Sequence, residues 1–206
     1  FQDLDFHIGY SYFEKSNPYE IYNGNEAKVQ KEELKKALKY FRNYIHQYNI
    51  PDSNNYRTAL LRIADSYFLL RNDSLAIENY AKSTNVGNYN HSYALNQMAT
   101  SQGLIQEYAG KINTLKSLTE KYPNSKYQVS SLLNLAQAYK DESRNQESIA
   151  TYLKFINDYP SNNLISKANV ELGSIYLKEK NTAEAEKYLI KVLDDYPDAE
   201  QENELA

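Results

Sequence analysis

The sequence predicts an all-α protein, an α-solenoid of about five helical hairpins, and two observations support this fold class. Pro123, Pro160 and Pro197 each follow a tyrosine and recur at a period of 37 residues. A fixed period of about 20–50 residues is typical of repeat architectures. Apolar residues elsewhere follow helical spacing, and no stretch shows the sustained alternation of a β-strand.

The first hairpin is predicted over residues 1–51, as two helices around an insertion at 15–30. Residues 2–14 and 26–48 both place apolar side chains at helical spacing. Pro18 and several asparagines lie between the helices and predict a loop. Two alternatives remain for the insertion. It shields the open end of the array together with a longer second helix, or it forms a binding lobe.

Four further hairpins follow. They are predicted at residues 54–88, 89–124, 125–161 and 162–198, with residues 199–206 as a tail or the start of another repeat. Their helices are predicted at 55–70, 74–83, 93–105, 108–122, 126–140, 146–159, 165–178 and 182–196. Ser125 with Gln128, and Asn181 with Glu184, have the spacing of capping boxes. Each proline follows a helix end, where it interrupts no hydrogen-bond ladder.

The hairpins resemble the tetratricopeptide repeat, whose arrays form right-handed solenoids. In the last repeat the matching positions are Leu172, Gly173, Tyr176, Ala185, Leu189 and Pro197. Similar sets of matching residues occur in the earlier repeats, although leucines such as Leu60 occupy the position of the family's tryptophan. A small residue such as Gly173 lets two helix backbones approach closely, and stacking then buries the apolar faces that one hairpin leaves open. The resemblance implies a protein-binding or peptide-binding scaffold rather than an enzyme.

The Tyr-Pro ending also resembles repeats of Gram-negative envelope proteins, such as the outer-membrane assembly lipoprotein and the Tol–Pal accessory protein. That resemblance implies a periplasmic or outer-membrane-associated protein, with a cytoplasmic location as the alternative. Phe1 already lies within a helical pattern, so we expect the chain to be a mature form or a piece of a longer protein. The partner's identity and the oligomeric state stay open.

Composition excludes several other classes of function. The net charge is −4, and an acidic run from Asp194 to Glu204 leaves the rest nearly neutral, without the basic cluster of a nucleic-acid-binding protein. There are no cysteines, and the three histidines lack metal-ligand spacing. We therefore expect no catalytic residues, no cofactor and no metal. No apolar run reaches the roughly 18 residues of a membrane span.

In tetratricopeptide arrays the first helix of each hairpin lines a concave groove, and this implies a set of partner-binding residues. They are Phe6, Tyr10, Phe13, Leu61, Asp65, Phe68, Leu69, Tyr93, Asn96, Thr100 and Leu104, with Tyr19, Ile21 and Tyr22 as possible contacts from the insertion. The N-terminal end of this groove is aromatic and apolar, and the C-terminal end is polar. Two alternatives remain for the aromatic end. It binds a peptide segment, or it packs against the insertion or a preceding repeat.

These observations favour a scaffold or adaptor that binds a protein or peptide through its groove in a bacterial cell-envelope assembly. One alternative is a sensor or regulatory module of a larger cytoplasmic signalling protein. A second alternative is a helical protein that binds carbohydrates or other small ligands, for which the aromatic end would serve as a stacking platform.

Overall fold

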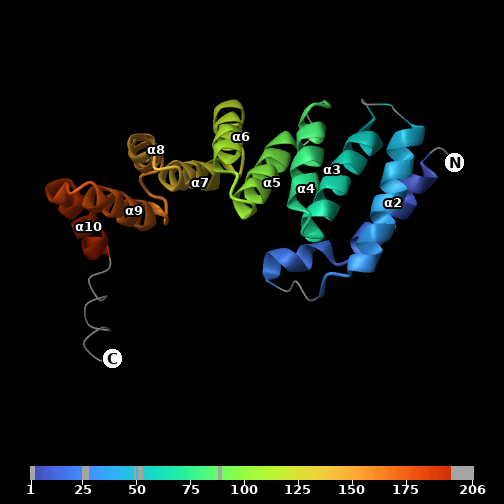
Figure 1. Ribbon diagram of the computed structural model, residues 1–206, viewed down its shortest axis with the longest axis horizontal. Helices are drawn as coiled ribbons and strands as arrows, with labels where there is room; N and C mark the ends of the chain where they lie inside the picture. Colours follow the sequence, from blue (N-terminus) through green and yellow to red (C-terminus); the bar gives the residue numbers. More distant parts are fainter. Residues whose placement is uncertain (1–2, 25–27, 49, 51–52, 88–89, 196–206) are drawn as a thin grey trace. The chain divides into compact units, whose positions relative to one another are not determined.

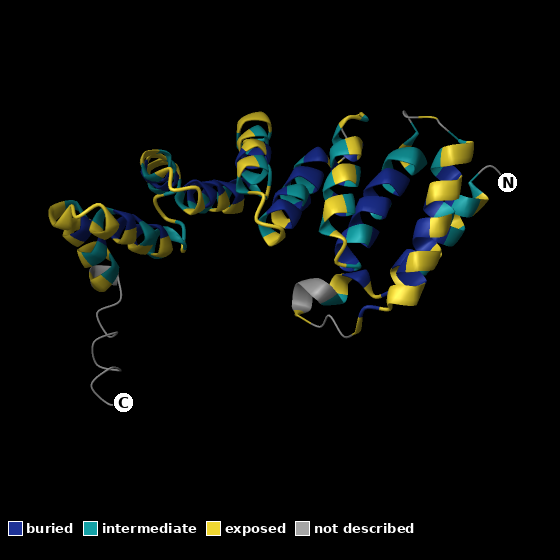
Figure 2. Ribbon diagram, in the orientation of Figure 1, coloured by how far each residue is buried: buried dark blue, intermediate teal, exposed yellow. Residues whose placement is uncertain are grey.

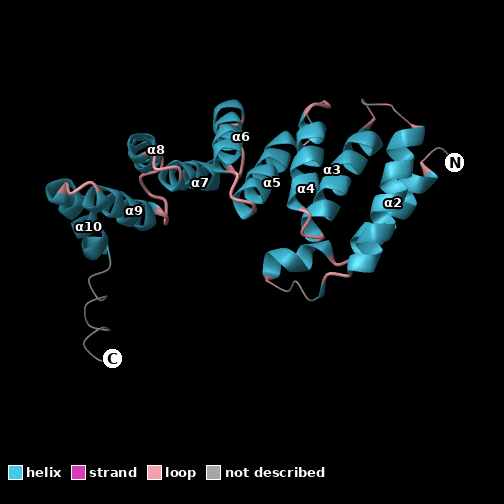
Figure 3. Cartoon of the chain, in the orientation of Figure 1, coloured by secondary structure: helices cyan, strands magenta, loops and turns pink. Residues whose placement is uncertain are grey.

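The computed structural model describes residues 3–24, 28–48, 50, 53–87 and 90–195. All regular structure among these residues is helical, in agreement with the predicted fold class (Figures 1 and 3). The chain divides into two compact units, residues 1–122 and residues 123–206, and each is described by itself.

The described residues of unit 1 form three helical hairpins and one short 3-10 helix. Its elements are α1 (Leu4–Lys15), η1 (Pro18–Asn23), α2 (Lys31–Gln47), α3 (Asn54–Leu69), α4 (Asp73–Thr84), α5 (His91–Leu104) and α6 (Tyr108–Lys121). Within hairpins, α1 packs on α2, α3 on α4 and α5 on α6. Between hairpins, α2 packs on α3 and α4 on α5, so each apolar helix face meets the next element (Figure 1).

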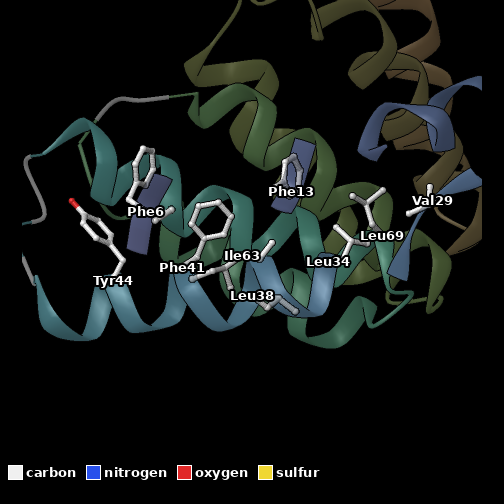
Figure 4. Close-up of a cluster of buried hydrophobic side chains, with 11 residues drawn as sticks. Phe6, Phe13, Val29, Leu34, Leu38, Phe41, Tyr44, Ile63 and Leu69 are labelled. Carbon is white, nitrogen blue, oxygen red and sulfur yellow. The ribbon is translucent and has the colours of Figure 1, made fainter. Parts of the chain in front are cut away.

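The main core of unit 1 lies where α1, α2 and α3 meet (Figure 4). Phe13 of α1, Phe41 of α2 and Ile63 of α3 are almost completely buried there. A close approach between the two helices of the first hairpin depends on Gly9, since a Cβ atom at this position would lie 2.9 Å from the Phe41 ring. The small residue that the sequence pattern requires at this position therefore has a steric cause.

The predicted helix at 26–48 is wrong at its start, because α2 begins only at Lys31. The Gln30 amide donates a 2.8 Å hydrogen bond to the carbonyl oxygen of Ser16, and the Val29 side chain is buried. These contacts tie the end of the insertion to the end of α1 before the helix can start. With 17 residues, α2 is still longer than the other second helices. Residues 25–27 lie outside the described residues.

Unit 2 contains two hairpins. Its helices are α7 (Gln128–Asp141), α8 (Asn145–Asp158), α9 (Ile165–Lys178) and α10 (Thr182–Asp195). Phe155 of α8 and Leu172 of α9 are fully buried in one cluster between the hairpins. Within the second hairpin, a Cβ atom on Gly173 would lie 2.6 Å from Cγ of Leu189, so α9 and α10 approach as closely as the sequence pattern predicts.

Four hairpin turns share one backbone geometry that their residue types do not indicate. Arg71, Gln106, Ser143 and Lys180 each adopt a left-handed conformation, with φ between 57° and 62°. In each turn the next amide donates to the carbonyl oxygen five residues earlier in the chain, for example from Arg144 to Tyr139 at 2.8 Å. This is the Schellman helix ending, which usually contains glycine. The same turn geometry therefore recurs in four hairpins, although the residue at the left-handed position differs from one to the next.

The two predicted capping boxes have different outcomes. Asn181 caps α10, because its Oδ1 atom accepts a hydrogen bond of 3.3 Å from the Glu184 amide. The prediction for Ser125 is wrong, since α7 begins only at Gln128. The Ser125 hydroxyl oxygen accepts from the Tyr127 amide, and its carbonyl accepts from the Gln128 amide. Ser125 therefore closes a turn before the helix.

Candidate protein-binding surface

Buried and exposed stretches alternate along the helices (Figure 2), and the residues that the resemblance implies for partner binding fall into two groups. The buried group is Phe6, Phe13, Leu61, Asp65, Phe68 and Leu69. The accessible group comprises half-buried Tyr10, Tyr93 and Asn96 and exposed Thr100 and Leu104. Only the accessible group offers side-chain surface to a partner.

The buried group is covered by helices of unit 1 itself. Phe6 and Phe13 belong to the core of the first hairpin. Leu61 and Phe68 pack with Tyr80 of α4 in a second cluster that also takes in residues of α5. Phe68 is only 6% exposed, so its ring contributes to the packing between hairpins.

Asp65 is the centre of a polar network that joins three helices. Its carboxylate is buried and accepts hydrogen bonds from Arg62 Nη1 at 2.6 Å, from the Tyr80 hydroxyl at 2.7 Å and from the Tyr93 hydroxyl at 2.9 Å. These donors lie on α3, α4 and α5. The network therefore fixes the Tyr93 hydroxyl and holds α5 against the preceding hairpin.

Burial and the neighbouring charges have opposite effects on the pKa values of Asp65 and Arg62. Burial raises the pKa of Asp65, while the Arg62 guanidinium and the Tyr80 and Tyr93 hydroxyls favour its ionised form. Burial acts to lower the pKa of Arg62, but the Asp65 carboxylate beside it raises that pKa on balance. A buried charge is tolerated only when it is paired and hydrogen-bonded, and Asp65 meets both conditions.

Arg62 also connects the network to α1 and to the insertion. Its guanidinium lies 5.1 Å from the centroid of the Phe13 ring. Burial raises the pKa of the Tyr19 hydroxyl in η1, and the positive charge of Arg62 acts in the opposite direction; Tyr19 is 53% exposed. Arg62 was not predicted from the sequence, although its spacing of three residues from Asp65 is that of a helical ion pair. The side chains of Ile21 and Tyr22 lie outside the described residues.

The accessible residues of the first helices in unit 1, together with Tyr19, are called the first-helix surface below. They are Tyr10, Tyr19, Tyr93, Asn96, Thr100 and Leu104. Tyrosines supply apolar contact area and a hydrogen-bonding hydroxyl, a combination common at protein interfaces. The Thr100 hydroxyl donates to the Asn96 carbonyl oxygen at 3.0 Å.

The corresponding helices of unit 2 carry polar side chains that are already paired. Lys140 Nζ of α7 donates to Glu171 Oε2 of α9 at 2.6 Å and to the Ser174 hydroxyl at 3.2 Å. Gln137 donates to Asp141 one turn further along α7. The bonds of Lys140 link the two first helices of unit 2, and a partner that used any of these groups would have to replace their existing bonds.

The described residues form neither a metal centre nor a membrane span. No group of three His, Cys, Asp or Glu side chains in that part of the chain is arranged to hold a metal ion. None of the described helices combines the length and the apolar character that a membrane span requires.

Family models of the tetratricopeptide repeat match three segments of the sequence, residues 93–125, 130–162 and 166–198. These segments take in parts of both units and coincide with the hairpins formed by α5 to α10. No curated protein sequence matches the chain.

The fold is similar to several solved structures. A crystal structure of MamA has a TM-score of 0.67 at 15% identity, covering 94% of both chains. MamA from Desulfovibrio magneticus RS-1 has a TM-score of 0.63 at 17% identity, covering 91% of this chain and 94% of that chain. YrrB, described as a TPR protein with an unusual peptide-binding site, has a TM-score of 0.64 at 16% identity, covering 91% of this chain and 86% of that chain. At these identities the likeness concerns the fold alone.

Proposed function

We propose that this chain, in which residues 93–125, 130–162 and 166–198 match tetratricopeptide-repeat models, is a non-enzymatic scaffold for a protein or peptide partner. The partner binds through the first-helix surface of unit 1, within a bacterial cell-envelope assembly. The observation that carries the proposal is the Asp65 network, which fixes Tyr93 beside the accessible side chains of α5.

A surface that is already ordered favours binding, because less conformational entropy is lost when the partner arrives. Tyr93 is held by its hydroxyl, and the neighbouring positions lie on a regular helix. Leu104 is 53% exposed and supplies an apolar contact at the end of α5. YrrB, which shares this fold, is described as having a peptide-binding site, and this makes a peptide a reasonable class of ligand here.

The cell-envelope location is part of the proposal and is supported by the repeat type. Tyr122, Tyr159 and Tyr196 precede the prolines that end successive repeats, as in the envelope proteins that the sequence resembles. Fractionation of cells of the source organism tests this location, and recovery of the protein only with cytoplasmic markers would refute it.

Site-specific photo-crosslinking tests the binding surface. A photoreactive amino acid at Thr100 is expected to give a discrete adduct with the partner in cells of the source organism. The matched control is the same amino acid at Lys116, an exposed position on α6. An adduct that forms equally from both positions, or only from Lys116, would refute binding at the first-helix surface.

A further inference from the structure

A second surface of unit 1 lies mainly on α2 and shares no residue with the first-helix surface. It is a depression of about 600 Å³, called the α2 groove below, and it is lined by Lys35, Leu38, Lys39, Arg42, Asn43, His46 and Tyr67. All of these residues except Tyr67 come from α2. Leu38 is buried and Tyr67 is half-buried, so the groove has an apolar floor beneath basic walls.

The cations of the α2 groove follow one helix face. Lys35, Lys39, Arg42 and His46 are separated by four, three and four residues, which places them in one row. Lys35 pairs with Glu32 at 2.7 Å. Lys39 and Arg42 are exposed, and neither forms an ion pair with a residue that the structure describes.

Nearby acidic side chains are already paired with other cations. Glu33 of α2 contacts Lys15 and Lys36 on a different side of the helix. The positive charge of Lys39 and Arg42 therefore faces solvent without a neutralising partner among the described residues.

We propose that the α2 groove binds an acidic, extended peptide segment of a partner protein. The row from Lys35 to His46 spans about 16 Å along the helix axis. An extended chain of about five residues has the same length. Alternate side chains of such a chain point the same way, so carboxylates can meet the basic row while an apolar residue contacts Leu38 and Tyr67.

A peptide fits these observations better than a nucleic acid or an anionic membrane. The basic row is a single stripe, and the whole chain carries a net charge of −4 that repels a long polyanion. The apolar floor has no role in phosphate binding, whereas it gives a peptide side chain a place to be buried. The inference concerns a different surface from the first-helix surface and does not depend on the proposed function.

Fluorescence anisotropy with a defined probe tests the α2 groove. The probe is a fluorescein-labelled peptide, Glu-Leu-Glu-Tyr-Glu-Leu-Glu, and its counterpart has Gln in place of each Glu. The wild-type chain is expected to bind the Glu peptide in a saturable manner at about 50 mM salt, and more weakly as salt rises. The Gln peptide is expected to bind at least about tenfold more weakly.

The variant Lys39→Glu/Arg42→Glu is expected to lose about tenfold or more in affinity for the Glu peptide. Its matched control, Lys116→Glu/Lys121→Glu, makes the same change in net charge on exposed residues of α6. The control is expected to bind like wild type, and circular dichroism checks that both variants are folded.

Three outcomes would overturn the inference. One is no saturable binding of the Glu peptide by the wild-type chain. Another is an equal loss of affinity in both charge-reversal variants, which would indicate an effect of net charge alone. The third is binding of single-stranded DNA or of anionic vesicles, lost with Lys39→Glu/Arg42→Glu, while the Glu peptide does not bind.

Discussion

The hydroxyl of Tyr93 on α5 donates a 2.9 Å hydrogen bond to the buried carboxylate of Asp65 on α3. These residues are 28 positions apart, and the bond crosses from one hairpin to the next. Tyr80 and Arg62 bind the same carboxylate. Asp65 therefore contributes to both the stability of unit 1 and the position of a residue on its candidate binding surface.

Replacement of Asp65 by Ala is expected to lower the free energy of unfolding by about 3 kcal/mol or more. The substitution removes the acceptor of three hydrogen bonds and leaves the half-buried Arg62 guanidinium without its counter-ion. Urea denaturation measures the change. The double variant Arg62→Leu/Asp65→Leu is the control. It is expected to lower the free energy of unfolding by less than the summed effects of Arg62→Leu and Asp65→Leu measured alone.

Replacement of Tyr93 by Phe tests the bond to Asp65 directly. The free energy of unfolding is expected to fall by about 1 kcal/mol, because one hydrogen bond to a buried charged group is lost while the aromatic ring is retained. Tyr108→Phe on α6 is the matched control and is expected to be nearly neutral. Equal effects of the two substitutions on the melting temperature would contradict the role of the Asp65 network.

Replacement of Gly173 by Leu is expected to destabilise unit 2 by about 2–3 kcal/mol through overpacking. A Cβ atom there would lie 2.6 Å from the Leu189 side chain. Gly103→Leu is the matched control, since the nearest group is the flexible side chain of Lys111, with Nζ at 3.3 Å. Thermal denaturation compares them, and a neutral result for Gly173→Leu would refute the close contact of α9 with α10.

Phe68 and Leu104 belong to the same implied groove but have different surroundings. Phe68→Ala is expected to cost about 3 kcal/mol or more, because it leaves a cavity beside Leu61 and Tyr80. Leu104→Ala is expected to change stability by less than about 0.5 kcal/mol, because the side chain is largely exposed. A small effect of Phe68→Ala in urea denaturation would place its ring on the surface instead.

The left-handed conformation of Ser143 predicts that glycine would be more stable at this position. Ser143→Gly is expected to raise the free energy of unfolding by a few tenths to about 1 kcal/mol, since glycine adopts positive φ without strain. Asn134→Gly, at an exposed position within α7, is the opposite control and is expected to cost about 0.5–1 kcal/mol. Melting temperatures that fall in both variants would contradict the turn geometry.

The sequence predicted the helices well where they are regular and less well where the chain leaves the repeat. Apolar spacing and the Tyr-Pro period located α7 to α10 within a few residues. The start of α2 was missed because the bond from Gln30 to Ser16 joins segments that no local pattern connects. The Schellman turns were missed because Ser143 and Lys180 are not glycine.

The sequence by itself determined the all-α fold, the hairpin repeat and the positions of the small residues, because these depend on the order and spacing of residue types along the chain. Only the tertiary structure decided which residues of the implied groove are accessible. Phe68 and Thr100 both lie on first helices, yet one is buried by neighbouring hairpins and the other is exposed. Burial depends on what packs against a residue, and the contacts of Asp65 with Tyr80 and Tyr93 arise only when separate hairpins stack.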